Sequence, residues 1–311
     1  MQARPGLLIL LGLTLAGATC KGASQEATSE STKSAITKEA DQIEAQAKQY
    51  APIDSIDITQ VPAAQRQDFL RILNETFCYC GCPRTLAACL SNKADCSCVG
   101  CSERMTTFIM NHFAAGMATE EVEITILQGF SEGYNGAKRE FDTSNHGTKG
   151  SPDAKLHIVE FAEFRCGHCR DAHPVLKQLA EQPGIKLSYF YYPLGKEDGP
   201  SALAAQAAEE ARIQGKFWEM ADLLYANKDS FDLKTLVSFA KKLKLDVKKF
   251  ENALTQQKHK SRVLADKATG QKYGVQSTPS IFINGRLFGF PRTPEYFVEY
   301  LAMEAERGEC R

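Results

Sequence analysis

Residues 159–169 read Val-Glu-Phe-Ala-Glu-Phe-Arg-Cys-Gly-His-Cys, and the fold can be worked out from this stretch. The apolar run from Ile158 to Phe164 predicts a buried strand, and apolar side chains at three- and four-residue spacing after Cys169 predict an amphipathic helix. The strand therefore delivers Cys166 to a helix N-terminus, where free backbone N–H groups and the helix dipole favour an anion. Because the thiolate is the reactive form of cysteine, Cys-x-x-Cys in this setting predicts a redox pair. Cys166 would be its nucleophile and the more buried Cys169 its resolving thiol.

Three motifs make residues from about 149 to 309 resemble the DsbA-type branch of the thioredoxin superfamily. The first is the strand, Cys-Gly-His-Cys and helix just described, with His173-Pro174 beyond it. The second lies in residues 204–220, and the third is Tyr-Gly-Val-Gln-Ser-Thr-Pro-Ser-Ile-Phe-Ile-Asn-Gly at residues 273–285. The resemblance implies an α/β thioredoxin-like fold over residues 153–311, with a helical insertion at about 197–265. It implies no cofactor for the redox pair.

The same resemblance assigns roles to residues around the pair. Thr278 and Pro279 match the cis-proline loop, which would offer backbone pairing to a substrate. Glu160 stands six residues before Cys166, where related proteins carry a buried acid that could take the proton from Cys169. Alternation along the strand would place Glu163 on the opposite face.

His168 lies between the two cysteines. A protonated imidazole there would stabilise the Cys166 thiolate and raise the reduction potential. The Gly-His dipeptide resembles that of protein disulfide isomerase, whose potential is about −180 mV against about −270 mV for thioredoxin. This favours an oxidase or isomerase over a reductase.

The beginning of the chain predicts export. Arg4, the apolar run Leu7–Leu15 and the small residues after it form a secretory signal over residues 1–18. An alternative is a lipoprotein signal to residue 19, with Cys20 lipidated. Residues 19–50 are polar and predict a flexible linker. Either route leads to the bacterial periplasm or cell envelope, where disulfides persist among the 11 cysteines of this chain.

Residues 51–136 predict a small, all-α, cysteine-rich domain of three helices. The helices are expected at Gln65–Phe77, at Glu103–Ala115 and from about Val122 onward. Residues 137–152 are expected to form an interdomain linker, with His146 in solvent.

Seven cysteines lie between the first two of these helices, and three interpretations remain open. Structural disulfides would stabilise a small core by about 2–4 kcal/mol each, and Cys310 could pair with the odd cysteine. A thiolate site for zinc or copper(I) is the second interpretation, and a second redox centre is the third. The seven are Cys78, Cys80, Cys82, Cys89, Cys96, Cys98 and Cys101.

This front domain is similar to the helical domain of CcmH-type cytochrome c maturation proteins. The likeness rests on residues 78–82, 113–122 and 126–134. The Leu-Arg-Cys-x-x-Cys motif of that family is absent, and Phe-Cys-Tyr-Cys-Gly-Cys stands in its place at residues 77–82.

The resulting hypothesis is an exported thiol–disulfide oxidoreductase that acts on cysteine-containing exported proteins, with a membrane redox partner. The front domain would exchange electrons with Cys166 and Cys169 or present a substrate. The alternative is a metal-handling protein whose redox pair keeps the front-domain thiols reduced. Nucleic acid is not an expected partner, because 37 basic and 38 acidic residues nearly cancel.

Overall fold

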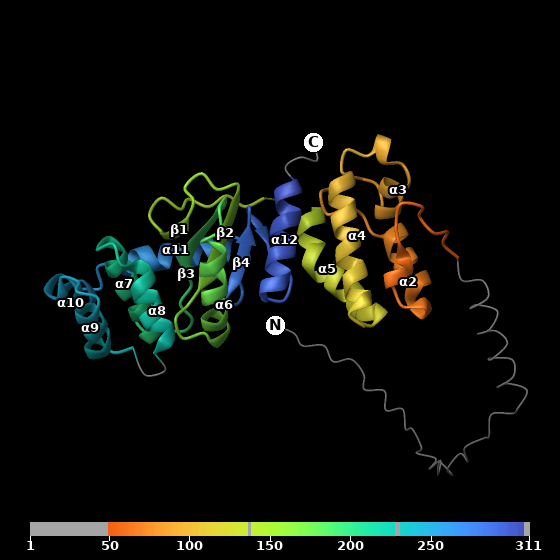
Figure 1. Ribbon diagram of the computed structural model, residues 1–311. Coiled ribbons are helices and arrows are strands. Elements are labelled where there is room, and N and C mark those ends of the chain that lie inside the picture. The colour runs from red at the N-terminus through yellow and green to blue at the C-terminus, as the bar shows by residue number, and fades with distance from the viewer. Residues whose placement is uncertain (1–48, 136–137, 228–230, 308–311) are drawn as a thin grey trace, which may run out of the picture. The chain divides into compact units, whose positions relative to one another are not determined.

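The computed structural model describes residues 49–135, 138–227 and 231–307 (Figure 1). The predicted signal segment, Cys20 and Cys310 lie outside these residues. From Tyr50 onward the chain forms one compact unit.

The front part contains the three predicted helices, α2 (Arg66–Glu75), α4 (Val99–Ala114) and α5 (Thr119–Asn135). Between them lie a further short helix, α3 (Leu86–Ser91), and the 3₁₀ turn η3 (Lys93–Asp95); η1 (Ile58–Gln60) and η2 (Ala63–Gln65) precede α2. Helix α3 begins at Thr85, whose hydroxyl accepts a hydrogen bond from the N–H of Ala88. Helix α4 begins four residues earlier than expected, so Cys101 lies in its first turn rather than in the preceding loop.

A five-stranded sheet follows, in the order β1-β3-β2-β4-β5. Its strands are β1 (Gly147–Gly150), β2 (Leu156–Ala162), β3 (Ile185–Tyr191), β4 (Ser280–Ile283) and β5 (Arg286–Leu287). Strands β2 and β3 are parallel, and the other neighbouring pairs are antiparallel. Strands β4 and β5 form the predicted hairpin, in which Asn284 and Gly285 both have positive φ, as a type I′ turn requires. The second strand ends at Leu287, earlier than expected.

The prediction of a linker at residues 137–152 is wrong at its end. Residues 147–150 form strand β1, which pairs with the edge of β3. His146 is buried rather than solvated: its Nε2 lies 2.9 Å from Oδ1 of Asp266, and its ring stacks on Phe190 with centroids 3.7 Å apart. The sequence of this strand, Gly-Thr-Lys-Gly, has no alternation of apolar and polar residues that would predict it. The strand forms because it pairs with β3.

Helices cover both faces of the sheet, and the thioredoxin-like fold with a helical insertion is confirmed. Helix α6 (Gly167–Leu179) connects β2 to β3. Helices α7 (Pro200–Ile213), α8 (Phe217–Ala226), α9 (Leu233–Lys242), α10 (Val247–Thr255) and α11 (Lys260–Lys272) separate β3 from β4. On β2, Ile158 packs into the same core as α6 and α12 (Pro294–Arg307), whereas Val159 and Phe161 join the core on the other face. Alternation along the strand therefore directs Glu160 to the face of α6.

The front helices and the sheet share one hydrophobic core through α12 and the segment before it. Helix α4 packs against α12. The ring of Phe290 lies 5.4 Å from that of Phe108 and 4.8 Å from that of Phe130, measured between centroids. A Cβ atom at Gly129 would lie 1.9 Å from the ring of Phe290, so only glycine allows this approach of α5. The two predicted domains are therefore packed together.

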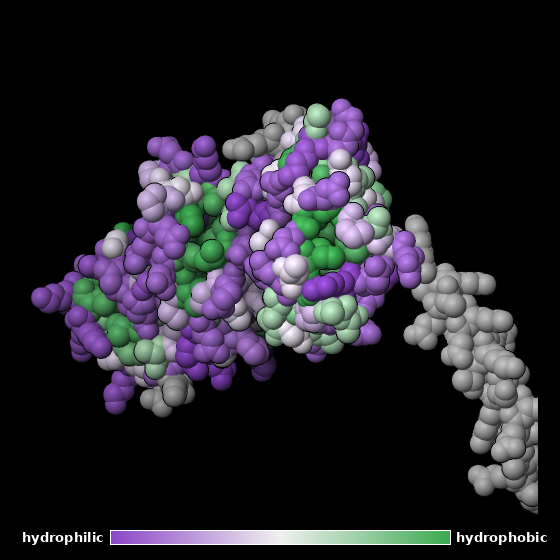
Figure 2. Space-filling model, turned by 45° about the vertical axis from the view of Figure 1, so that its right-hand side comes forward, coloured by the Kyte–Doolittle hydropathy of each residue, from purple (hydrophilic) through white to green (hydrophobic). Residues whose placement is uncertain are grey.

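The surface is largely hydrophilic and is interrupted by hydrophobic patches (Figure 2). Phe77, after α2, and Ile124 and Leu127, on α5, are the large exposed apolar side chains among the described residues of the front part. Within the described ranges, none of the helices has the length and apolar character needed to cross a membrane.

Candidate active site

Cys166 occupies the N-cap of α6, as the sequence predicts. Its Sγ accepts a hydrogen bond from the backbone N–H of Cys169 at 3.2 Å, and it lies 3.4 Å from the carbonyl oxygen of Thr278. The thiol group is half-buried, whereas Cys169, in the first turn of the helix, is fully buried. The arrangement gives one accessible sulfur and one protected sulfur.

Several donors stabilise the thiolate of Cys166. The hydrogen bond with the Cys169 thiol makes the largest contribution, and together with the Thr278 side chain and the backbone N–H groups of Cys169 and His168 it lowers the pKa of Cys166 to about 5. At neutral pH Cys166 is therefore a thiolate, the form that attacks disulfides and leaves from them readily.

Glu160 is a buried acid beneath the pair. Both of its carboxyl oxygens are buried without a hydrogen-bond partner among the described residues. Burial, reinforced by the negative charge of the Cys166 thiolate, raises the pKa of Glu160 to about 8. Burial also raises the pKa of Cys169, and repulsion from Glu160 raises it further. A carboxyl group with a pKa near neutrality, in electrostatic contact with a resolving thiol, suits proton transfer.

The cis-proline loop lies against the nucleophile. The Thr278–Pro279 peptide bond is cis, and the Thr278 carbonyl faces the sulfur of Cys166. Arg292 donates a hydrogen bond from Nη2 to the carbonyl oxygen of Pro279 at 2.9 Å, and its charge opposes the rise in the pKa of Glu160. Sequence reasoning missed Arg292, because a single arginine in a loop carries no recognisable pattern.

The structure places the remaining residues near the pair in other roles. The ring of His168 is exposed, and it is the backbone N–H of this residue that interacts with Cys166. His173 is buried, with Nε2 2.8 Å from Oδ1 of Asp222. Glu163, the residue directly after β2, is buried as well.

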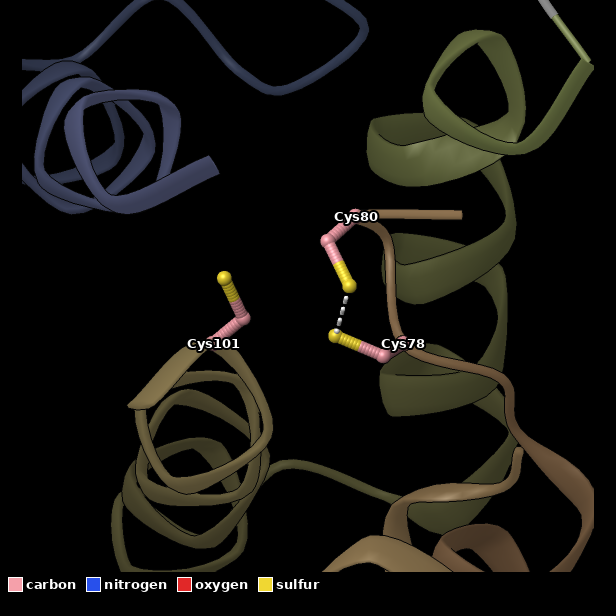
Figure 3. A group of neighbouring side chains, drawn as sticks. All are labelled: Cys78, Cys80 and Cys101. Carbon is pink, nitrogen blue, oxygen red and sulfur yellow. Dashed lines mark hydrogen bonds between the residues drawn. The ribbon is translucent and has the colours of Figure 1, made fainter. Parts of the chain in front are cut away.

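Six of the seven front cysteines form two groups of three. In the first group, Cys78 and Cys80 come from the loop after α2, and Cys101 comes from the first turn of α4. The sulfur atoms of Cys78 and Cys80 face each other, and that of Cys101 lies across from them (Figure 3). The Sγ atoms of Cys78 and Cys80 are 3.0 Å apart, and both residues are free thiols. A hydrogen bond with Cys101 and burial raise the pKa of Cys78 to about 12.

The second group is nested within the first in the sequence. It consists of Cys82 from the loop, Cys89 from α3 and Cys96 after η3. The sulfur atoms within each group lie within 4.8 Å of one another, so either group could hold a metal ion. Gly81, with φ of 88°, turns the chain between Cys80 and Cys82 and so directs these neighbours to different groups.

The comparison with known families agrees with this geometry. Residues 142–302, more than half of the chain, match the model of the family described as Thioredoxin. The chain belongs to the thioredoxin family. The cysteine-rich front part of this thioredoxin-family protein lies outside the matched residues.

Curated relatives match this thioredoxin-family protein over part of their length. The Na(+)/H(+) antiporter NhaA 3 of Salinispora tropica is 32% identical over 183 residues, which is 58% of this chain and 28% of the antiporter. The antiporter NhaA of Herminiimonas arsenicoxydans is 32% identical over 139 residues, 44% of this chain and 22% of the antiporter. The chain therefore spans less than a third of the length of these relatives.

Solved structures also resemble the thioredoxin-like part. Oxidised BdbD from Bacillus subtilis has 21% sequence identity and a TM-score of 0.49, covering 53% of this chain and 95% of that one. The thiol–disulfide exchange protein alpha-DsbA2 from Wolbachia pipientis has 18% identity and a TM-score of 0.46, covering 59% and 93% of the two chains.

Proposed function

We propose that the protein is a thiol–disulfide oxidoreductase that oxidises or isomerises disulfides in other proteins. The single observation that carries this proposal is the arrangement of Cys166 and Cys169. A stabilised, accessible thiolate stands at a helix N-terminus, beside a buried thiol and a cis-proline loop. Stabilisation of the thiolate favours the reduced form of the pair, and a pair with a favoured reduced form is an oxidant.

The exchange balances in two steps. When the pair is oxidised, a substrate thiolate attacks Sγ of Cys166, the bond between Cys166 and Cys169 breaks, and Cys169 leaves and takes up a proton. A second substrate thiolate then attacks the substrate sulfur of the mixed disulfide and releases the Cys166 thiolate. The substrate is oxidised by two electrons and the pair is reduced. In the reverse direction, Cys169 gives its proton to Glu160 as it attacks the mixed disulfide.

Equilibration with glutathione at pH 7 tests the direction of this function. We expect a standard potential less negative than about −200 mV, in the range between protein disulfide isomerase at about −180 mV and DsbA at about −120 mV. The fraction of reduced pair is measured by alkylation and mass spectrometry of the peptide that holds Cys166 and Cys169. A potential near −270 mV, like that of thioredoxin, would instead make the protein a reductant.

We propose exported proteins with exposed cysteines as the substrates, the bacterial periplasm or cell envelope as the location, and a membrane redox partner to reoxidise the pair. The support is the sequence of the first 18 residues and the high number of cysteines. The CcmH likeness of the front domain and a role in cytochrome c maturation rest on sequence motifs alone, as does lipidation of Cys20.

Metal handling is a second candidate function, and the two cysteine groups favour it. Thiolate ligands select soft ions such as zinc and copper(I). In this function the thioredoxin-like pair would keep the front thiols reduced.

Metal analysis of protein isolated in its native state, with and without prior alkylation, tests this second function. We expect zinc or copper to remain bound at one or more ions per chain and to protect the front cysteines from alkylation. A protein that holds no metal and whose front cysteines react only after reduction would have structural disulfides there, and the second function would then be discarded.

A further inference from the structure

We propose that each of the two front cysteine groups is a separate trigonal binding site for one copper(I) ion. The first site is formed by Cys78, Cys80 and Cys101, and the second by Cys82, Cys89 and Cys96. This inference deepens the metal-handling candidate by naming the ion, the ligands and the stoichiometry.

The two groups have the ligands and burial of a soft-metal site. Each brings three sulfur atoms within 4.8 Å of one another, and among the described residues no histidine or carboxylate oxygen joins either group at that distance. Four of the six side chains are buried: Cys78 and Cys89 are 0% exposed, Cys101 is 1% exposed and Cys96 is 6% exposed. Three largely buried sulfur ligands suit an ion that binds thiolate and needs no water ligand.

Coordination number separates copper(I) from zinc. Structural zinc sites are almost always tetrahedral with four protein ligands, whereas copper(I) is a closed-shell ion that accepts three sulfur ligands. Only the first group has a further cysteine beside it, because Cys98 interacts with Cys80. The second group has no fourth ligand of that kind among the described residues. The lack of a fourth ligand therefore favours copper(I) over zinc in the second group, and in the first group the three mutually close sulfurs already complete a copper(I) site, with Cys98 beside Cys80.

Disulfides explain the groups less well. A disulfide joins two sulfurs and would leave one thiol unpaired in each group of three. The two sulfurs that lie nearest, those of Cys78 and Cys80, belong to residues separated only by Tyr79, and a disulfide between them would close a very small ring. Tyr79 is itself buried, and its hydroxyl donates a hydrogen bond to the carbonyl oxygen of Met303, which holds this segment against α12.

The first group and Cys166 lie beside opposite ends of α12. Arg104, near the first group on α4, contacts Glu306 in the last turn of α12. Arg292, just before the first turn of α12, holds the cis-proline loop beside Cys166. The helix has 14 residues and is about 21 Å long, whereas thiol exchange needs sulfur atoms in contact. We therefore place the proposed copper sites and the redox pair on separate parts of the molecule.

Anaerobic titration with copper(I) in the presence of a competing copper(I) chelator tests the proposal. The sample is the reduced full chain with Cys166→Ser and Cys169→Ser, so that the redox pair cannot take metal. We expect two copper ions per chain, with three sulfur neighbours per copper in X-ray absorption spectra. Adding Cys101→Ser or Cys89→Ser should each reduce the stoichiometry to one, and adding both should reduce it to zero.

The matched control is Cys98→Ser, which removes a neighbouring cysteine that is not in either group. We expect it to keep two copper ions. Loss of copper in this variant, uptake of fewer than two ions by the parent chain, or preference for zinc in an equimolar competition would overturn the proposal.

Circular dichroism verifies that each variant folds. A variant that unfolds is replaced by one with alanine at another cysteine of the same group. Thiol–disulfide exchange is measured separately, on the chain with Cys166 and Cys169 intact. A chain that binds no copper can therefore still be shown to be an oxidoreductase, and a chain without exchange activity can still be shown to bind copper.

Discussion

The Cys166→Ser variant is expected to lose thiol–disulfide exchange by at least ~10³-fold, because a serine hydroxyl cannot replace the attacking sulfur. Cys166 is the half-exposed sulfur at the N-cap of α6 and the one whose thiolate is stabilised by neighbouring donors. The measurement is the rate at which the reduced protein reacts with a fluorescent peptide disulfide. Residual activity within tenfold of the parent protein would show that another cysteine is the nucleophile.

The matched variant, Cys169→Ser, should stop the same reaction halfway. Cys166 can still attack the peptide disulfide, but the buried sulfur that resolves the mixed disulfide is gone. We therefore expect a covalent adduct of protein and peptide to accumulate, visible as one added peptide mass that disappears on reduction. If Cys169→Ser released product as the parent does, the assignment of the two roles would be wrong.

The Glu160→Gln variant is expected to slow resolution of the mixed disulfide by about 10²-fold at pH 8, the lower end of what general acid–base catalysis contributes. Above about pH 8 the parent carboxyl group is ionised and can accept the proton of Cys169; at lower pH it is protonated and cannot. The parent rate should therefore rise with pH and level off near or slightly below pH 8, because the Cys166 thiolate that helps raise this pKa is absent in the mixed disulfide. The rate of the variant should lack this rise, and the two proteins should converge below about pH 6.

Glu163→Gln is the control, because it removes a second buried carboxyl group at the end of the same strand. We expect less than about a threefold change in the resolution rate, since this group has no assigned part in the proton transfer. Equal pH profiles for Glu160→Gln and the parent would remove Glu160 from the mechanism.

The free energy of unfolding should also depend on the pKa of Glu160, and it should fall as the pH rises. A carboxyl group whose pKa rises from 4.5 to about 8 on folding contributes stability that is complete below pH 4.5 and is lost as the pH rises through about 8. Between pH 4 and pH 9 the parent should lose on the order of 4–5 kcal/mol of unfolding free energy that Glu160→Gln keeps. Urea unfolding of the reduced proteins at several pH values measures the difference.

Local signals in the sequence were enough to predict the thioredoxin-like part. The Cys-Gly-His-Cys motif between an apolar strand and an amphipathic helix placed Cys166 correctly at the N-cap, and Asn284-Gly285 placed the hairpin. The spacing before Cys166 pointed to Glu160, although its burial depends on which face of β2 packs under α6. These features are determined by residues close together in the chain.

The features that were missed depend on contacts between distant residues. Strand β1 exists because β3 offers it an edge, and His146 is buried because Asp266 lies opposite it, 120 residues later. The seven cysteines could not be grouped from their spacing, because a positive φ at Gly81 and a short helix holding Cys89 decide which sulfurs meet. Arg292 became recognisable only when its contact with the cis-proline loop was seen.

The fit of Phe290 against Gly129 has a consequence for how this chain could be divided. The thioredoxin part on its own would begin near residue 142. Without the front helices, the rings of Phe290, just before α12, and of Tyr296, in its first turn, would lose their partners Phe108 and Phe130 and face water. Phe290 also lies two residues before Arg292, the side chain that holds the loop beside Cys166. The front helices thus cover an aromatic surface of the redox domain. An excised domain would expose that surface and tend to aggregate, and its cis-proline loop beside Cys166 would be held less firmly. Any exchange of this domain between proteins would have to carry a matching partner for that aromatic surface.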